Sequence, residues 1–276
     1  MTYETVTFEA RDAVGVLTLN RPKLLNAIDT KMVQEINAVL DAVAADDDIR
    51  VLVLTGAGRA FCAGFDLKES AGKERKGPVD WRPELERDFN LIMRFWHLRK
   101  PTISAVHGYC LAGGCEMALA CDITIAAEGT MFGEPELRFG SGMIALLMPW
   151  LTGPKQAKEL LLTGNDRVPA DRALAIGLIN KVVAEGEHLD AALAMARQIA
   201  VMFPETVALT KMAINRTYEI MGMGVALDMG LDIDVEIESL ETPERLKFQD
   251  ISKREGLKAA IAWRDSRFGE SGDGKE

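Results

Sequence analysis

The chain has 276 residues and is 48% hydrophobic, so it is long enough to bury a large core as one main domain with an appendage. Its formal net charge of −10 argues against a nucleic-acid binding surface, because such a surface must neutralise phosphates. This charge does not exclude a small anionic ligand, since a few Lys and Arg side chains can form a local basic pocket.

Three further features of the sequence bear on whether the protein is secreted, spans a membrane or binds a metal. Residues 1–5 show no basic segment followed by an apolar run, so we expect no secretory signal and a cytoplasmic location. The most apolar stretch, residues 143–151, contains Pro149 and is far shorter than the ~20 residues that cross a bilayer. The four cysteines have irregular spacings and only three His are present, so we expect buried free thiols and no metal site.

Short aliphatic and β-branched runs alternate with helical periodicity through the first two thirds of the chain. The runs at residues 15–19, 51–55, 102–106, 123–127 and 177–183 predict strands. Residues 32–44 predict a helix, because their apolar residues recur at spacings of three and four. This alternation predicts repeated β-then-α units, with a sheet that is covered on both faces.

A polar segment interrupts this pattern. Residues 68–76 are charged and residues 80–84 contain Trp81 and Pro83, which predicts an exposed loop before the next helix. Two interpretations of this loop stay open, a lid over a site and a solvated connector.

Beyond residue 190 the pattern becomes mainly helical, with predicted helices at residues 189–202, 206–221, 225–239 and 242–263. The third segment alternates with period two from Leu227 to Ile237, but it exceeds the usual length of a strand, so we predict a helix. Its apolar residues occupy more than one face, which predicts packing against a neighbouring subunit.

Two glycine-containing loops, residues 55–67 and 107–116, each follow a predicted strand. Both expose backbone amides, and the second leads into an apolar helix whose N-terminus favours an oxygen with negative charge. Taken singly, each loop is also typical of any strand-to-helix turn, because Gly permits close packing and positive φ. Neither loop matches a phosphate-binding loop or a dinucleotide fingerprint. Together, the two loops can converge on one oxygen.

Two glutamates follow among apolar neighbours. Glu116 lies directly after the second loop, and Glu136 lies in Phe132-Gly133-Glu134-Pro135-Glu136. A buried carboxyl with a like charge nearby has a raised pKa, so such a pair can supply one proton donor and one base. The structural alternative is that Glu136 caps a helix or pairs with Arg138.

At these residues the sequence resembles the crotonase superfamily, the enoyl-CoA hydratase/isomerase family, over nearly the whole chain. The matching motifs in chain order are Asn20-Arg21-Pro22-Lys23 with Asn26-Ala27, residues 60–68, residues 107–122, residues 132–136, Leu162-Thr163-Gly164, residues 175–179, and Phe248 with Glu255-Gly256. The resemblance implies an α/β fold built as a spiral of ββα units in residues 1–195. It also implies a helical region in residues 196–276 that closes the acyl-CoA pocket and builds homotrimers, or hexamers as dimers of trimers.

The resemblance also implies the site. The backbone N–H groups of Phe65 and Gly113 would form an oxyanion hole for a thioester enolate. Glu116 would activate the water that attacks C3, and Glu136 would deliver the proton to C2. The residues implied in substrate and coenzyme A binding are Lys23, Ala63, Asp66, Leu67, Lys68 and Ile144.

Two segments depart from the family pattern. The C-terminal basic motif, commonly Glu-Lys-Arg, reads Ala262-Trp263-Arg264 here, which puts that coenzyme A contact in doubt. The run after Glu136 reads Gly142-Met143-Ile144-Ala145 where hydratases have a glycine-rich run, so Ile144 replaces a glycine near the catalytic water. A larger side chain there can shift the water or reshape the acyl pocket.

The resemblance therefore implies reversible syn hydration of a 2-enoyl-CoA to a 3-hydroxyacyl-CoA in fatty acid metabolism. No cofactor is implied, because coenzyme A is part of the substrate, and no nucleic acid, membrane or metal partner is expected. The nearest alternative is another enolate reaction on the same scaffold: Δ3-Δ2 isomerisation, thioester hydrolysis or retro-aldol cleavage. A noncatalytic or RNA-binding role is the alternative from a different class.

Four other residues are predicted to be structural rather than chemical. His107 is predicted at a strand end, Cys62 as a small packing residue, Trp96 in the core, and Asp122 in structural hydrogen bonds.

Overall fold

The computed structural model describes residues 3–71, 73, 75 and 77–268, and its centre is a six-stranded sheet with the order β1-β2-β3-β4-β6-β9. The strands β1 and β2 pair antiparallel, and the remaining neighbours run parallel. The aliphatic composition of the central strands suits a sheet that is covered on both faces. The six strands are β1 (Val6–Arg11), β2 (Val14–Leu19), β3 (Val51–Gly56), β4 (Thr102–Val106), β6 (Ile123–Ala127) and β9 (Lys181–Val183).

A second sheet lies beside the first, with the order β5-β7-β8. It is formed by β5 (Tyr109–Leu111), β7 (Met131–Gly133) and β8 (Val168–Pro169). The chain passes from β4 to β5, through the helix α4 (Gly113–Ala120), and then to β6 and β7. Each such turn adds one strand to each sheet, so the predicted α/β spiral of ββα units is confirmed.

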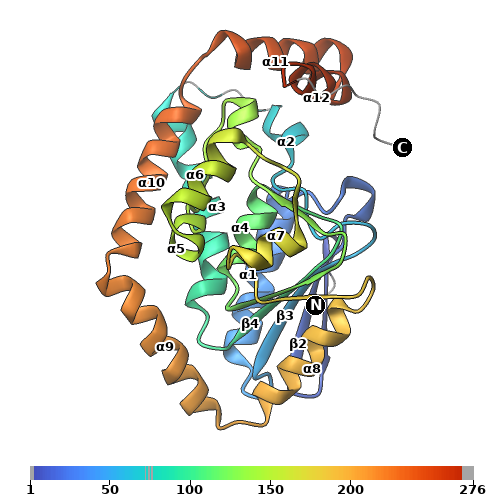
Figure 1. Cartoon of the computed structure of the whole chain (residues 1–276), viewed down its shortest axis with the longest axis vertical. Coiled ribbons are helices and arrows are strands. Elements are labelled where there is room, and N and C mark those ends of the chain that lie inside the picture. Colours follow the sequence, from blue (N-terminus) through green and yellow to red (C-terminus); the bar gives the residue numbers. More distant parts are fainter. Residues whose placement is uncertain (1–2, 72, 74, 76, 269–276) are drawn as a thin grey trace.

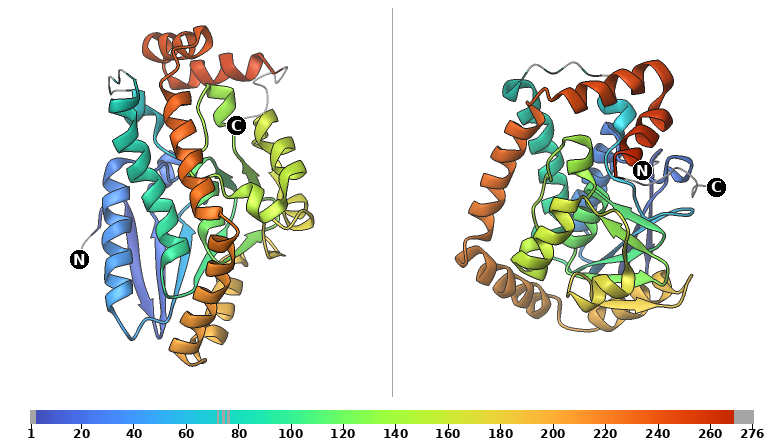
Figure 2. Two further views of the ribbon diagram at one scale, coloured as in Figure 1. Left: turned by 90° about the vertical axis from the view of Figure 1, so that its left-hand side faces the viewer. Right: turned by 45° about the horizontal axis from the view of Figure 1, so that its top comes forward.

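Helices cover both faces of the large sheet (Figures 1 and 2). The helix α8 (His188–Ala200) packs on β2, β3, β4 and β6, and the helix α1 (Thr30–Ala45) packs on the other side against β1, β2 and α3 (Pro78–His97). The predicted apolar residues of α1 are all buried, and the Asp29 side chain accepts from the Met32 amide to cap its first turn.

Shorter elements complete the core. Two 3-10 helices, η1 and η2, and three short helices lie between the strands: η1 (Pro22–Leu24), η2 (Glu136–Phe139), α5 (Met148–Thr152), α6 (Pro154–Thr163) and α7 (Ala170–Ala175). The four cysteines are buried and free, as predicted, and burial raises the pKa of the Cys62 thiol to about 12.

The C-terminal part is helical, as predicted. The helices α9 (Pro204–Ile220) and α10 (Met223–Glu238) run along one edge of the molecule, and α11 (Pro243–Glu255) and α12 (Leu257–Ser266) lie across one end of it, near α2 (Leu67–Ala71) (Figure 1). The helical interpretation of residues 225–239 is therefore right, despite their period-two pattern. The single helix predicted for residues 242–263 is wrong, because Gly256, with φ of 91°, separates α11 from α12.

Two further predictions are corrected. The strand predicted for residues 177–183 forms only at Lys181–Val183, after a turn in which Gly177 has a positive φ of 77°. The loop predicted for residues 68–84 is largely helical, because α2 occupies its beginning and α3 starts at Pro78, where proline suits the first turn of a helix. Residues 72, 74 and 76 of that predicted loop, and residues 269–276, lie outside the described residues.

Within the described ranges, no single helix is both long and apolar enough to span a membrane. The helices α8 and α9 reach that length and composition only as a pair, and they are bent by 109° relative to each other.

Candidate active site

A cavity of about 450 Å³ lies between the spiral core and the C-terminal helices. One wall is formed by the first glycine loop, the start of α4 and residues 135–144. The opposite wall is formed by side chains of α3, α10, α11 and α12. The two loops and Glu136, which are far apart in the sequence, therefore face one space.

The first loop presents the Phe65 amide. Residues Ile28 and Phe65 form an isolated parallel β-bridge, whose hydrogen bonds run from the Ile28 amide to the Gly64 carbonyl and from the Asp66 amide to the Ile28 carbonyl, each 2.8 Å. This pattern uses the neighbours of Phe65 and leaves the Phe65 N–H without a hydrogen-bond acceptor among the described residues. The Phe65 side chain lines the cavity.

The second loop presents the Gly113 amide. Gly113 is the first residue of α4, where an N–H has no acceptor within the helix. The preceding residue, Ala112, has φ of 55° and ψ of −139°, a conformation that is costly for a residue with a Cβ. The Ala112 amide donates to the Gly133 carbonyl at 2.8 Å, which helps to hold the turn in place.

The two loops are in direct contact. A Cβ added to Gly64 would lie 2.5 Å from the Ala112 Cβ, and one added to Gly113 would lie 2.3 Å from the Phe65 ring. A Cβ on Gly114 would lie 2.6 Å from the Cβ of Cys62, which also confirms Cys62 as a packing residue. Only glycine permits this approach, so the two free amides are presented by loops packed against each other.

Glu116 lies in α4 and its side chain is buried among apolar neighbours. Its Oε1 accepts from the Ala145 amide at 3.1 Å, while its Oε2 has no hydrogen-bond partner among the described residues. Burial raises the pKa of Glu116 well above its ordinary value, and the nearby Glu136 carboxyl raises it further. Glu116 does not itself line the cavity, whereas Ile144, next to its hydrogen-bond donor, does.

Glu136 is the first residue of η2 and lines the cavity. Its Oε2 also has no partner within the described ranges, and burial raises its pKa to about 8. Arg138, the partner considered in the structural alternative, has its guanidinium 4.7 Å from the centre of the Phe268 ring and 3.9 Å from Asp166. Because two charges so close and so poorly hydrated are costly, the two glutamates retain at least one proton at neutral pH.

A third glutamate belongs to the same group. Glu134 is buried behind Glu136, and burial together with Cys115 raises its pKa well above the ordinary value. Glu134 lies in residues 132–136, the motif that also contains Glu136, but the sequence pattern does not indicate a separate role for it.

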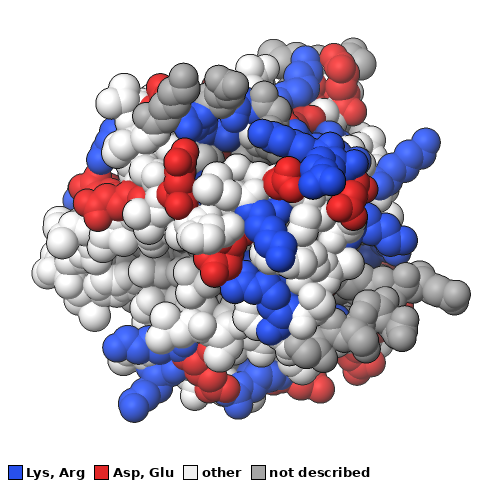
Figure 3. All heavy atoms as spheres, turned by 90° about the horizontal axis from the view of Figure 1, so that it is seen from above, with Lys and Arg blue, Asp and Glu red and all other residues white. Residues whose placement is uncertain are grey.

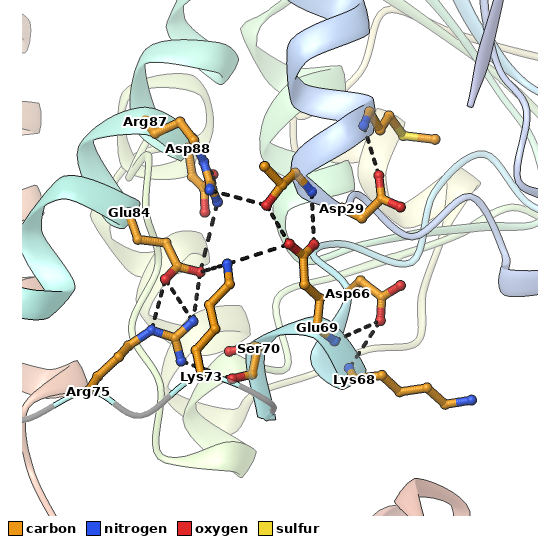
Figure 4. A network of polar contacts seen from close by, with 12 residues as sticks. Asp29, Asp66, Lys68, Glu69, Ser70, Lys73, Arg75, Glu84, Arg87 and Asp88 are labelled. Atoms are coloured by element: carbon orange, nitrogen blue, oxygen red, sulfur yellow. Dashed lines mark hydrogen bonds and ion pairs between the residues drawn. The ribbon is translucent and has the colours of Figure 1, made fainter. Parts of the chain in front are cut away.

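Lys68 has the position expected of a phosphate-binding residue. It lies in α2 at the cavity, and no ion pair to its ammonium group is found among the described residues. Figure 4 shows this ammonium pointing away from the neighbouring ionic network, in which Lys73 lies 3.5 Å from Glu69 and 3.2 Å from Glu84. Lys23 is exposed in η1 and does not line the cavity, although its neighbours Leu24 and Leu25 do.

The remaining predicted contacts of the first loop also fall at the cavity. Ala63, Asp66 and Leu67 all line it. The Asp66 carboxylate lies 3.1 Å from the Arg21 guanidinium and accepts from the Lys68 amide at 3.0 Å. Asp66 therefore fixes the loop and the start of α2, and is less available to a ligand.

An ionic network ties α2 to α1 and α3 (Figure 4). Glu69 accepts a hydrogen bond from the Thr30 amide at 2.8 Å. Glu84 accepts hydrogen bonds from two nitrogens of the Arg75 guanidinium at 2.7 and 2.8 Å. The Arg75 guanidinium also lies 4.1 Å from the centre of the Trp81 ring. These contacts place Trp81 in the cavity wall, in the segment predicted to be a loop.

Arg264, the remaining member of the altered C-terminal basic motif, lines the cavity but is buried and bound to Asp265. Its guanidinium lies 4.4 Å from the centre of the Phe139 ring. Figure 3 shows Lys and Arg side chains, with Asp and Glu side chains among them, across this end of the molecule.

Several residues of the helical wall were missed by the sequence analysis. These are Trp81, Leu85, Asp88, Asp234, Glu238 and Arg245, all of which line the cavity. Asp234 carried a usable signal, because it is an acidic residue between Ile233 and Val235 in an apolar segment. The helices α3 and α10 approach each other only in the folded chain, so the pattern could not place the others.

The other single residues behave as predicted. Trp96 is buried and packs edge-on against Tyr218, and Asp122 accepts from Thr102 and pairs with Lys211 at 2.8 Å. His107 follows β4, stacks on His188 and does not line the cavity.

Comparisons with known proteins identify the family of this chain. The chain matches the sequence model of the enoyl-CoA hydratase/isomerase family over residues 9–242. It belongs to the enoyl-CoA hydratase/isomerase family. A short-chain-enoyl-CoA hydratase of Clostridium acetobutylicum is 36% identical over 86% of this chain and 88% of its own length. A crotonyl-CoA hydratase of Syntrophomonas wolfei is 34% identical over 97% of this chain and 99% of its own.

Among solved structures, an enoyl-CoA hydratase/isomerase from Xanthobacter autotrophicus Py2 superimposes with a TM-score of 0.95. It is 50% identical in sequence, and the match covers 97% of this chain and 99% of that one.

Proposed function

We propose that this protein is an enzyme that catalyses the reversible syn hydration of a 2-enoyl-CoA to a 3-hydroxyacyl-CoA. The observation that carries the proposal is the pair of carboxyls, buried Glu116 and half-buried Glu136, next to two loops that present free amides. The names of the relatives from C. acetobutylicum and S. wolfei support the same reaction.

The two amides would stabilise the intermediate. The thioester oxygen of the substrate would accept hydrogen bonds from the Phe65 and Gly113 N–H groups, and it becomes an enolate oxygen when C3 is attacked. Donors fixed before the reaction stabilise such a charge without reorganising, and removing one typically costs about 3 kcal/mol of barrier.

The two glutamates would handle the protons. Ionised Glu116 would take a proton from water as the water oxygen bonds to C3, and protonated Glu136 would give its proton to C2 as the enolate collapses. After one turnover Glu116 holds a proton from water and Glu136 has lost its own, so the two carboxyls together carry as many protons as before. Exchange of protons with solvent then restores ionised Glu116 and protonated Glu136. The pKa of both carboxyls is raised, which favours one retained proton on the pair, and the proposal places that proton on Glu136 and the charge on Glu116.

The coenzyme A portion would extend from the cavity across the end formed by η1, α2 and α12. We propose that Lys68 meets a phosphate and that Lys23, on the adjacent η1, contributes at the rim. Ala63 and Leu67 would contact the pantetheine arm. The reaction uses no metal or other cofactor in this proposal, and coenzyme A enters as part of the substrate.

The direct test is loss of the conjugated thioester absorbance when crotonyl-CoA or an aromatic enoyl-CoA is added, with the 3-hydroxyacyl-CoA product identified by mass. We expect turnover that Glu116→Gln and Glu136→Gln remove. No turnover of either substrate, together with isomerisation of a 3-enoyl-CoA, would refute the hydratase assignment.

We also propose that the chain forms homotrimers, alone or as dimers of trimers. Large apolar side chains are exposed along α9 and its flanks, including Phe203 at 81%, Ile220 at 86% and Val225 at 67%. Such a surface is costly in water unless another subunit covers it. Light scattering on the purified protein tests this, and a monomeric mass would contradict it. The cytoplasmic location stays a prediction.

A further inference from the structure

Asp234 is a buried acid in the cavity wall that the proposed reaction does not use. It lies in α10, lines the cavity and is only 2% exposed. Neither of its carboxyl oxygens has a hydrogen-bond partner of normal geometry among the described residues. A polar side chain buried to this extent needs a partner, so its position in a ligand cavity is informative.

The groups around Asp234 do not provide that partner. The nearest cation, Arg245, is bound to the Glu238 carboxylate and donates to the Glu238 carbonyl at 2.8 Å. Its guanidinium lies 5.2 Å from the centre of the Trp81 ring. On the other side the Gly142 amide lies near the carboxyl and lowers its pKa, but it makes no hydrogen bond of normal geometry; a Cβ on Gly142 would lie 2.1 Å from the Asp234 Oδ1.

Apolar side chains lie close to Asp234. Trp81, Leu85 and Ile144 line the cavity, and Trp81 and Ile144 pack on a buried cluster of Leu85, Leu231 and Val235. The carboxyls of Asp88 and Glu238 also line the cavity, but each is paired with an arginine, so an acyl chain would meet Asp234 as the unpaired carboxyl of this helical wall among the described residues. A purely alkyl chain would leave Asp234 without a hydrogen-bond partner, which is unfavourable.

A hydroxyl group fits this position better than the other common donors. Burial raises the pKa of Asp234 to about 7, and Glu238 adds to the rise, so both protonation states occur at neutral pH. A hydroxyl can donate to the carboxylate and accept from the carboxylic acid. An ammonium group can pair only with the carboxylate and would itself lose hydration among the apolar side chains.

We propose that Asp234 binds a hydroxyl group on the acyl chain, so that the natural substrate is a hydroxylated 2-enoyl-CoA. The substrate class rests on the hydration proposed above, whereas the hydroxyl subsite rests on the cavity alone. Asp234 is a specificity residue in this view, because it would bind the acyl chain and takes no part in the proposed proton transfers, although its charge also raises the pKa of Glu116 and Glu136.

Binding of unreactive ligands tests the subsite without any reaction. Calorimetry would compare 4-hydroxybutanoyl-, 5-hydroxypentanoyl- and 6-hydroxyhexanoyl-CoA with the unsubstituted acyl-CoA of equal chain length. A hydrogen bond to a charged or half-charged group typically changes affinity about tenfold or more, so one hydroxylated ligand should bind at least about 10-fold more tightly than its partner. Asp234→Leu should abolish this preference, and Asp234→Asn should keep part of it.

Asp232→Asn is the matched control, because Asp232 lies on the same helix but is exposed and pairs with Arg82 at the surface. It should leave the preference unchanged, and circular dichroism would verify that each variant folds. No preference for any hydroxylated ligand in the unmodified protein, or a preference that survives Asp234→Leu, would overturn the proposal.

Turnover of 2-hexenoyl-CoA and 6-hydroxy-2-hexenoyl-CoA separates the two proposals. If neither compound is hydrated but the binding preference is present, the reaction is wrong and the subsite stands. If both are hydrated at equal kcat/KM and no binding preference exists, the subsite is wrong and the reaction stands.

Discussion

The two walls of the cavity are built in different ways. The core wall presents backbone amides and Glu136 from the spiral, with Glu116 buried nearby, and its geometry depends on glycines at which a Cβ has no room. The helical wall presents side chains of α3, α10, α11 and α12, which are not constrained in this way. This difference suggests that the core wall performs the chemistry and that the helical wall selects the acyl chain.

The largest effect should come from the glutamates of the core wall. Glu116→Gln and Glu136→Gln each keep the shape but remove a proton-transfer group, so we expect kcat to fall by about 10² to 10⁴. Because both groups serve one reaction, the double variant should lose less than the product of the single losses. Steady-state kinetics with crotonyl-CoA measures this, and near-normal kcat in either variant would remove that residue from the mechanism.

The next effect should come from the contact between the loops. Gly64→Ala places a Cβ 2.5 Å from the Ala112 Cβ at a φ of 92°, so both loops must shift. We expect kcat to fall by about 10² to 10³, the loss typical of one oxyanion donor. Gly186→Ala is the control, because Gly186 also has a positive φ, 84°, but has no atom within 4 Å of the added Cβ. Equal losses of activity in the two variants would show that backbone strain, and not the loop contact, is responsible.

A smaller effect is expected where the two walls meet. Ile144 packs on the cluster of Leu85, Leu231 and Val235, and Ile144→Ala would lengthen the acyl space. Since each buried CH₂ contributes about 0.8 kcal/mol, the ratio of kcat/KM for 2-octenoyl-CoA to that for crotonyl-CoA should rise about tenfold. An unchanged ratio would place the end of the acyl chain elsewhere.

The last expected effect is on stability and not on turnover. Burial raises the pKa of Asp234 from 3.8 to about 7 in the folded state. Such an acid contributes least to the stability of the folded state above pH 7, because the buried carboxyl must then ionise. The stability of the unmodified protein should therefore fall between about pH 4 and pH 7. Asp234→Leu should remove this loss and be more stable at pH 8 by about 2 kcal/mol, with little gain at pH 4. Urea denaturation at both pH values measures this, and equal gains at both would exclude ionisation as the cause.

The same contrast explains what the sequence could predict. The strands, the loops around Phe65 and Gly113, and the positions of Glu116 and Glu136 depend on local patterns, which glycines and aliphatic runs make visible. The beginning of α3 was mistaken for a loop, because Trp81, Pro83 and charged residues are typical of exposed turns. The ionic contacts of Glu84 and Arg75 that accompany α3 join distant segments and leave no periodic pattern.

The helical wall was also hard to predict for a second reason. The alternation in residues 227–237 disguised a helix, and Asp234 differs from its exposed neighbour Asp232 only in the direction its side chain takes in the folded helix. The Asp234 side chain faces the cavity only once α10 packs beside α3 in the folded chain.

The division of labour between the walls is tested most directly by one pair of variants with one pair of substrates. Glu136→Gln and Asp234→Leu would each be assayed with 2-hexenoyl-CoA and 6-hydroxy-2-hexenoyl-CoA. We predict that Glu136→Gln lowers kcat for both substrates by the same factor, at least about 10². Asp234→Leu should lower kcat for 2-hexenoyl-CoA far less than Glu136→Gln does, since Asp234 affects only the pKa of the glutamates, and should change the ratio of kcat/KM between the substrates by about tenfold or more. If Asp234→Leu lowers kcat for both substrates as strongly as Glu136→Gln does, the helical wall takes part in the chemistry and the division is wrong.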